Sequence, residues 1–204
     1  MNRRRIAAVA ALGASLAFVA AGCGGGSGDG AAAAPTTTTT TGVPTSTTTT
    51  TVVLPTPEPP PPDPYAPTPI VEMGSIEIPR IGLAHAIYEG VTLTVLDQGP
   101  GHWPGTAQPC DRGNSVFPGH RTTYSRPFHD LDLMQPGDQV IVRLPGRMCV
   151  YEATGTQIVQ PTDLWVVDRS PEATITLIAC HPKGSDAQRI VLKARLVADI
   201  PTIA

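Results

Sequence analysis

From residue 71 to residue 200, the apolar residues of this chain occur in short runs that glycine and proline interrupt at close intervals. The runs are rich in β-branched residues, and helical periodicity is weak along them. The clearest runs are residues 74–78, 114–117, 139–144, 150–157, 174–180 and 189–196. Many short strands at such spacing predict a mainly β domain, a barrel or a sandwich, with a short helix over 93–99 and a turn over 127–133. About 130 residues are enough for one hydrophobic core.

The segment ahead of this region has a different composition. Residues 24–70 contain two threonine runs and a proline block, which spans 55–69. Such a segment cannot bury a core, so we predict a disordered stalk over 24–70, partly polyproline II, followed by a globular domain over 71–204. Its threonines are open to O-glycosylation if it lies outside the cell, and a plain spacer is an equally good interpretation.

The N-terminus has the pattern of an export signal. A basic start, Arg3 to Arg5, precedes an uncharged apolar stretch over 6–21, which is short for a membrane span. Small residues then lead to Cys23, which resembles a bacterial lipobox, although Ala20 stands where leucine is commoner. We therefore predict a signal peptide over 1–23 with lipidation of Cys23, and an uncleaved signal anchor is the alternative. Both place the rest of the chain outside the membrane.

The charge of the chain argues against a nucleic-acid partner. The formal net charge is −3, and the basic residues form no stripe along the sequence. We expect no cofactor.

The cysteines lead to a pairing hypothesis. There are four, Cys23, Cys110, Cys149 and Cys180, and thiols outside the cell tend to pair. With Cys23 lipidated, three remain, so one stays unpaired. Cys110 lies in a loop and Cys149 in a strand-like run, and we predict a disulfide between them. Cys180 is then the free thiol.

Cys180 stands at a position that suits a nucleophile. It ends the strand-like run 174–180, and the turn residues His-Pro-Lys-Gly follow at once. Arg189 opens the next run, so a hairpin would bring Cys180 and Arg189 together. A thiol needs a nearby cation or base to react as a nucleophile, and the arrangement indicates a cysteine enzyme.

His120 is the candidate base. It follows the run 114–117 through a Pro-Gly pair, at the mouth of a second strand. His181 adjoins Cys180, but neighbours in a strand point to opposite faces, so it is a poor partner. A metal site from His120, Cys180 and His181 is disfavoured because adjacent ligands rarely converge on one ion. The remaining histidines lie in predicted loops: His85, His102 and His129.

Together, His120, Cys180 and Arg189 resemble the triad of the sortases, the cysteine transpeptidases of bacterial cell walls. The histidine stands in a Gly-His pair, the cysteine ends a Thr-Leu-x-x-Cys motif, and the arginine opens the next strand. Further ordered motifs are similar to class E sortases of actinobacteria, at residues 99–107, 117–123, 127–131, 136–138 and 180–184. The resemblance covers nearly all of residues 74–197.

The resemblance implies a closed, eight-stranded sortase β-barrel. It implies cleavage of a C-terminal Leu-Pro-x-Thr-Gly or Leu-Ala-x-Thr-Gly sorting signal on secreted proteins, between Thr and Gly, through a thioacyl-enzyme on Cys180. An amine, such as that of a peptidoglycan precursor or another protein, would resolve the thioester. His120 would be the general acid and base, and Arg189 would stabilise the oxyanion or the substrate. The enzyme would be held at the extracytoplasmic face of the membrane and reach into the wall.

Two departures from the family pattern matter. Ala179 stands where the family usually has threonine, so we expect a hydroxyl near the substrate to be missing. A lipobox also replaces the usual transmembrane helix. A rival family, the L,D-transpeptidases, resembles Ser-His-Gly-Cys, but Ile178 stands where its histidine would be. A non-catalytic exported adaptor domain is the other alternative, and the complete triad argues against it.

Overall fold

The computed structural model describes residues 53–203, in which one eight-stranded sheet dominates. The strands are β1 (Glu72–Ile78), β2 (Leu83–Glu89), β3 (Gly101–His102), β4 (Gly113–Pro118), β5 (Gln139–Leu144), β6 (Arg147–Val159), β7 (Ala173–His181) and β8 (Gln188–Pro201). Four short helical turns join them: α1 (Leu93–Leu96), η1 (Pro79–Ile81), η2 (Leu131–Leu133) and η3 (Leu164–Val167). The predicted signal peptide, Cys23 and both threonine runs lie outside the described residues.

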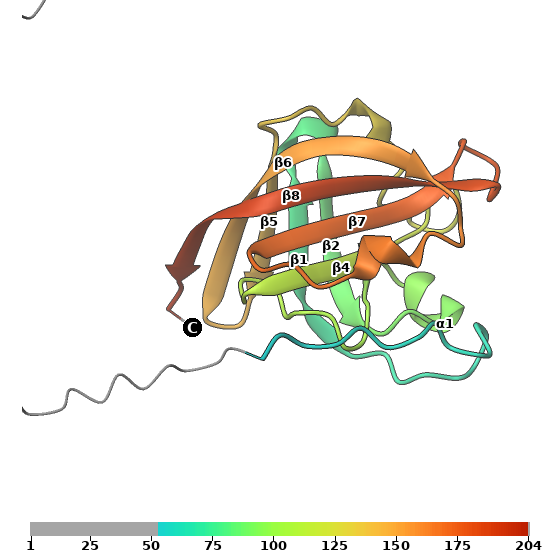
Figure 1. Ribbon diagram of the computed structural model, residues 1–204, viewed down its shortest axis with the longest axis horizontal. Coiled ribbons are helices and arrows are strands. Elements are labelled where there is room, and N and C mark those ends of the chain that lie inside the picture. The colour runs from blue at the N-terminus through green and yellow to red at the C-terminus, as the bar shows by residue number, and fades with distance from the viewer. Residues whose placement is uncertain (1–52, 204) are drawn as a thin grey trace, which may run out of the picture. The chain divides into compact units, whose positions relative to one another are not determined.

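The sheet curls into a nearly closed barrel (Figure 1). The strand order is β3-β2-β1-β5-β6-β8-β7-β4, and only the β2–β3 and β4–β7 pairs are parallel. The two edges of the sheet meet where the Trp103 N–H, just after β3, donates to the Val116 carbonyl of β4 at 2.8 Å. The predicted mainly β, eight-stranded barrel is confirmed.

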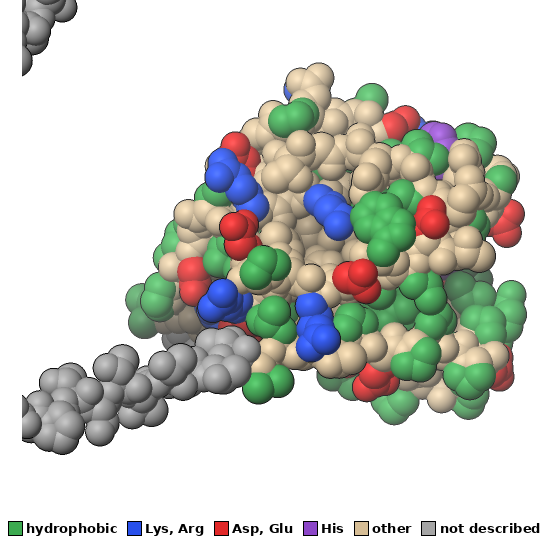
Figure 2. Space-filling view, viewed as in Figure 1, with side chains coloured by type: hydrophobic (Ala, Val, Ile, Leu, Met, Phe, Trp, Pro, Cys, Tyr) green, Lys and Arg blue, Asp and Glu red, His purple; other side chains and the backbone are tan. Residues whose placement is uncertain are grey.

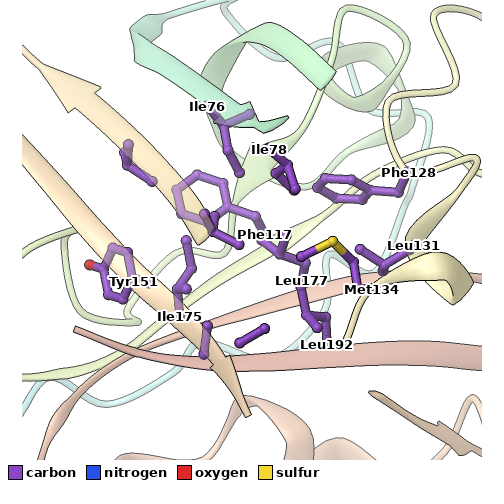
Figure 3. Close-up of a cluster of buried hydrophobic side chains, with 14 of the residues drawn as sticks. Ile76, Ile78, Phe117, Phe128, Leu131, Met134, Tyr151, Ile175, Leu177 and Leu192 are labelled. Atoms are coloured by element: carbon purple, nitrogen blue, oxygen red, sulfur yellow. The ribbon is translucent and has the colours of Figure 1, made fainter. Parts of the chain in front are cut away.

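Alternation along each strand decides which side chains fill the barrel. On β7, Ile175, Leu177 and Ala179 lie in the interior cluster, where Leu177 packs with Leu192 of β8 (Figure 3). Burying a side chain of this size stabilises the fold by about 1.5–3 kcal/mol. The intervening residues of β7, which include Ile178, therefore face outward.

A second apolar cluster covers the outer face of the barrel. Ile178 of β7 is paired with Val191 of β8, and Val116 of β4, two residues back in the register, lies in the same cluster. Two valines of η3, Val166 and Val167, belong to this cluster as well. The connection between β6 and β7, which contains η3, therefore packs on the outer face of the sheet.

A disulfide links Cys110, in the loop before β4, to Cys149 of β6, and their Cα atoms lie 5.5 Å apart. The Cys110 N–H donates to the Tyr151 hydroxyl at 2.7 Å, and burial raises the pKa of that hydroxyl to about 12. Arg147 pairs with Asp111 at 2.7 Å and Asp199 at 2.8 Å. Cys110, Cys149 and Asp199 are close enough to hold a metal, but the disulfide occupies both sulfur atoms.

The described end of the predicted stalk, residues 53–70, runs along the barrel and past α1 (Figure 1). The Glu58 N–H donates to the Pro104 carbonyl at 2.9 Å, and the Trp103 indole N–H donates to the Glu58 carbonyl at 2.8 Å. Composition gives no sign of these contacts, because an extended proline-rich chain has no hydrogen bonds of its own and offers its carbonyls to whatever lies beside it. No helix within residues 53–203 is long and apolar enough to cross a membrane.

Candidate active site

Cys180 and Arg189 face each other across a strand pair. Cys180 is the penultimate residue of β7, and its partner in the antiparallel register is Arg189, the second residue of β8. Directly paired residues project to the same side of a sheet. Because Cys180 has the parity of Ile178, both side chains project from the outer face. The Cys180 thiol is half-buried and free.

His120 follows β4, the strand on the other side of β7 from β8. β4 runs parallel to β7, with Pro118 level with Ile178, and the Gly119 N–H donates to the Ile178 carbonyl at 2.9 Å. The paired register ends at Pro118, and His120 follows two residues later, so His120 lies just beyond the end of β4, beside the end of β7 that carries Cys180. Gly119 is required there, because a Cβ atom would lie 2.8 Å from the Phe128 ring.

The three candidate residues thus come together at the ends of β8, β7 and β4, and we call them the row. Arg189 and Cys180 are directly paired on one face, and His120 follows the end of the adjacent strand β4, just beyond the apolar cluster under η3. A thiol, a guanidinium and an imidazole at this spacing supply a nucleophile, a fixed cation and an acid–base group. The arrangement suits nucleophilic attack on a carbonyl.

Arg189 already holds the β7–β8 turn. Its Nη1 donates to the backbone carbonyls of Asp186 at 2.7 Å and Gln188 at 2.9 Å. Within residues 53–203 it makes these hydrogen bonds through Nη1 alone, which leaves Nε and Nη2 for a ligand. A guanidinium has five donors, so one side chain can brace the turn and meet an oxyanion.

Two residues that the sequence analysis missed surround His120. The Nε2 atom of His120 lies 2.8 Å from an oxygen of the Asp97 carboxylate, and the ring of Tyr124 stacks on the imidazole at 5.1 Å. A hydrogen bond to Asp97, together with its charge, raises the pKa of the Tyr124 hydroxyl. Asp97 directly follows α1, and no motif in the sequence marks it.

A buried arginine, also missed, supports the backbone at Cys180. Arg121 is 2% exposed, and its Nη1 donates to the Cys180 carbonyl at 3.2 Å. Its Nε donates to the His129 carbonyl, and its Nη2 pairs with Asp132 at 2.8 Å. Desolvation opposes ionisation of Asp132, but a backbone hydrogen bond and the Arg121 charge lower its pKa overall. The buried cation is therefore compensated, and the backbone at Cys180 is fixed.

The other histidines have structural surroundings. His102 is 1% exposed, between the Glu89 carboxylate at 3.0 Å and the Ala107 carbonyl at 2.9 Å. His129 contacts Asp130, and His85 contacts the Ala86 carbonyl. His181 ends β7 on the opposite parity from Cys180, and its Nδ1 is buried without a partner in the described part of the chain.

One expectation about the substrate is wrong. Ala179 was expected to remove a hydroxyl that touches the substrate, but its side chain is 2% exposed and belongs to the interior cluster of the barrel. The cause is the two-residue period of the strand: Cys180 faces outward, so residue 179 faces inward. A side chain at position 179 affects packing beneath the site.

A hollow elsewhere on the same face is separate from this row. Figure 2 shows a depression in the face formed by β6, β8 and β7, with charged side chains of both signs around it. It is lined by Thr154, Trp165, Thr174 and Lys193, whose ammonium lies 5.0 Å from the Trp165 ring centre. Thr174 is six residues before Cys180 on β7, about 20 Å along the strand, so this hollow does not include the thiol.

Comparison with known proteins gives consistent matches. The family described as Sortase domain matches residues 76–197. Sortase SrtE1 of Streptomyces coelicolor is 29% identical over 142 residues, which cover 62% of this chain and 40% of that protein. Sortase D of Bacillus subtilis is 32% identical over 128 residues, with 61% and 63% covered. The chain thus spans less than two thirds of the length of these relatives.

Solved structures of the same kind superpose on the barrel. Sortase E from Streptomyces avermitilis has a TM-score of 0.60 at 30% identity, covering 64% of this chain and 91% of that one. Sortase E1 from Streptomyces coelicolor, with a tripeptide in its active site, has a TM-score of 0.62 at 25% identity and the same coverage. The Clostridium perfringens Sortase D5 transpeptidase has a TM-score of 0.58 at 31% identity, with 62% and 79% covered.

Proposed function

The chain belongs to the sortase family of cysteine transpeptidases, with class E sortases among its relatives, and from that premise we propose a reaction for it. The domain over residues 71–204 cleaves a C-terminal sorting signal of the Leu-Ala-x-Thr-Gly or Leu-Pro-x-Thr-Gly kind between Thr and Gly. It then transfers the new carboxyl end of the protein to an amine. The observation that carries the proposal is the pairing of Arg189 with Cys180 across β8 and β7, with His120 just beyond the end of the adjacent β4.

The first half-reaction forms a thioester. The thiolate of Cys180 attacks the threonine carbonyl carbon, and the charge that develops on the oxygen is met by the free donors of Arg189. As the carbon–nitrogen bond breaks, His120 as imidazolium gives its proton to the leaving glycine amine. The acyl group is then held on sulfur in an activated form, so no nucleotide is needed outside the cell.

The second half-reaction releases the enzyme. An amine attacks the thioester carbonyl, His120 accepts the proton that the amine loses, and the carbon–sulfur bond breaks to restore the thiolate. Sulfur is a good leaving group because its thiolate is stable, so the amine competes with water chiefly through its nucleophilicity and its position.

The partners and the location follow from the same proposal. The donors are secreted proteins with a C-terminal sorting signal, and the acceptor is an amine of the cell wall, such as a peptidoglycan precursor, or of another protein. Residues 1–23 anchor the chain at the outer face of the membrane through lipidated Cys23 or as a signal anchor. The stalk over 24–70 carries the domain toward the wall.

The test is incubation with Leu-Ala-x-Thr-Gly and Leu-Pro-x-Thr-Gly peptides, with and without an added amine, and mass analysis of the products. We expect a transpeptidation product whose mass equals the peptide through threonine plus the amine. Cys180→Ser serves as the matched control. Intact peptides under all conditions, together with a Cys180 that resists thiol-reactive probes, would favour the non-catalytic adaptor instead.

A further inference from the structure

The contact between His120 and Asp97 fixes which ring nitrogen carries a proton in the neutral imidazole. The carboxylate accepts at 2.8 Å from Nε2, so Nε2 is the protonated nitrogen, and Nδ1 is left to exchange a proton with a ligand. Both side chains are largely shielded, with 17% of His120 and 26% of Asp97 exposed. Shielding makes the contact stronger than a surface pair of the same length.

Tyr124 covers this pair with a backbone that is itself strained. Its ring lies 5.1 Å from the imidazole at 25° to it. Its φ angle is +50°, and that of Arg126 in the same loop is +41°, both in the left-handed region that side chains other than glycine rarely adopt. Such strain persists only where surrounding contacts impose it, and it is often found at functional sites.

Asp97 is held by a helical turn that needs outside support. α1 spans only Leu93–Leu96, and a single turn is not stable alone. The Pro64 carbonyl accepts the Leu93 N–H at 2.7 Å, which satisfies a donor that a helix start leaves unpaired. Thr92 also donates to the Thr68 hydroxyl at 3.0 Å. The supporting residues come from the end of the stalk.

We propose that Asp97 is a positioning residue that holds His120 in one tautomer and orientation, and that stalk residues 64–68 in turn hold Asp97 in place. The inference rests on the proposed function only in taking His120 as the acid–base group. The stalk then has a second role beside carrying the domain away from the membrane, because its last residues support the active site. Displacing them loosens His120 without touching the barrel core.

The first arm of the test changes the carboxylate in the full-length chain. Asp97→Asn should lower kcat about 10- to 100-fold, the range seen when a metal-bound histidine loses its carboxylate partner, with KM nearly unchanged. Nitrogen NMR of labelled histidine should show the Nε2–H form of His120 in the parent and a loss of that preference in the variant. The tautomer signal would not move if Asp97 only stabilised the fold.

Asp138→Asn is the matched control. The Asp138 carboxylate also supports a turn, accepting the Gln135 N–H at 2.8 Å, and it is similarly shielded at 22% exposed. It should lower the melting temperature and leave both kcat and the His120 tautomer as in the parent. The same kcat loss and the same tautomer change in Asp138→Asn would overturn the assignment of Asp97.

The second arm loosens the stalk end by combining Pro64→Gly with Thr68→Val. Weakening its hydrogen bonds to α1 should lower kcat about 3- to 10-fold. Adding Asp97→Asn should then cost little more than Asp97→Asn alone, because both changes act through one contact. The control pair, Pro44→Gly with Thr45→Val, should change nothing. Fully additive losses, or no loss from the stalk variant, would overturn the link between stalk and site.

Failure of this inference can be told apart from failure of the proposed function. If Cys180→Ala still cleaves peptides, the proposed function is wrong, whatever Asp97 does. If Cys180→Ala is inactive while Asp97→Asn keeps the parent kcat and the parent tautomer signal, only the positioning role is wrong. The NMR measurement needs no turnover, so it decides the His120–Asp97 contact in both cases.

Discussion

The cysteines near the two ends of strand β8 are in different chemical states: one pair forms a disulfide, and the other cysteine is a free thiol. Near Asp199, the Cys110–Cys149 disulfide is buried and braced by Arg147. Near the other end, about 33 Å away along the strand, the Cys180 thiol is free and half-buried. The braced end has its charged groups paired, whereas the Cys180 end has an arginine with donors to spare. One end suits stability, and the other suits reaction with a ligand.

The largest expected effect is the loss of peptide cleavage, without a loss of stability, when the Cys180 thiol is removed. Cys180→Ala should abolish peptide cleavage, because no other side chain in the row is a competent nucleophile, and should leave the melting temperature close to that of the parent. Cleavage measured by mass and unfolding measured by calorimetry test both halves. Residual cleavage at the parent rate would mean that the nucleophile lies elsewhere.

Removal of the acid–base group comes next. His120→Ala should lower turnover by about two to four orders of magnitude, the typical contribution of a positioned acid–base group. His181→Ala, on the opposite parity of β7, is the matched control and should have a mild effect. Steady-state kinetics on one peptide decide the order. An inactive His181 variant beside an active His120 variant would contradict the register argument.

At the braced end, removing the Cys110–Cys149 disulfide should lower the stability of the fold and leave activity in place. The double variant Cys110→Ala, Cys149→Ala opens a loop with a sequence separation of 39, which the chain-entropy model values at about 3–4 kcal/mol. Chemical denaturation should show that loss, while cleavage at low temperature persists. A stable but inactive double variant would erase the contrast between the two ends.

Tyr124 allows a smaller test, because its substitution should lower activity without lowering stability. Tyr124→Asn replaces the residue with one that tolerates a positive φ, so the melting temperature should not fall, while kcat drops several-fold through loss of the ring over His120. Tyr124→Phe keeps the stacking and should retain more activity. A variant that loses both stability and activity would show that Tyr124 is mainly a packing residue.

The smallest effect is a pH dependence at the braced end. Arg147 lowers the pKa of Asp199 below its unfolded value, so this pair stabilises the protein above about pH 4 and the benefit is lost as the pH falls through the folded pKa. Asp199→Asn should therefore melt slightly below the parent at pH 7. The gap should close in acid. A constant difference from pH 7 to pH 2 would exclude this linkage.

Sequence reasoning reached the parts of the site that strand geometry determines. Cys180 and Arg189 flank a short turn, so hairpin pairing brings them together, and the same two-residue period explains why His181 points away. Applied one residue earlier, that period would also have placed Ala179 inside the barrel. The error came from treating a motif position as a contact without asking which face it occupies.

The missed residues depend on contacts between distant segments. Asp97 reaches His120 over a separation of 23 residues, and Arg121 meets the Cys180 carbonyl over 59. No local pattern encodes such pairs, because they follow from how loops cross the end of the barrel. The contacts of Pro64 and Thr68 with α1 were hidden for a related reason: their segment has no apolar pattern, and its hydrogen bonds are made by backbone and hydroxyl groups.

The most direct test of the proposed reaction is to trap the acyl-enzyme. The protein is incubated with a Leu-Ala-x-Thr-Gly peptide in the absence of added amine, quenched in acid, and analysed by intact mass and peptide mapping. We expect an adduct equal to the peptide through threonine, joined as a thioester to Cys180, that accumulates in His120→Ala more slowly than in the parent. Cleavage that proceeds with no adduct on Cys180, and persists in Cys180→Ala, would contradict it.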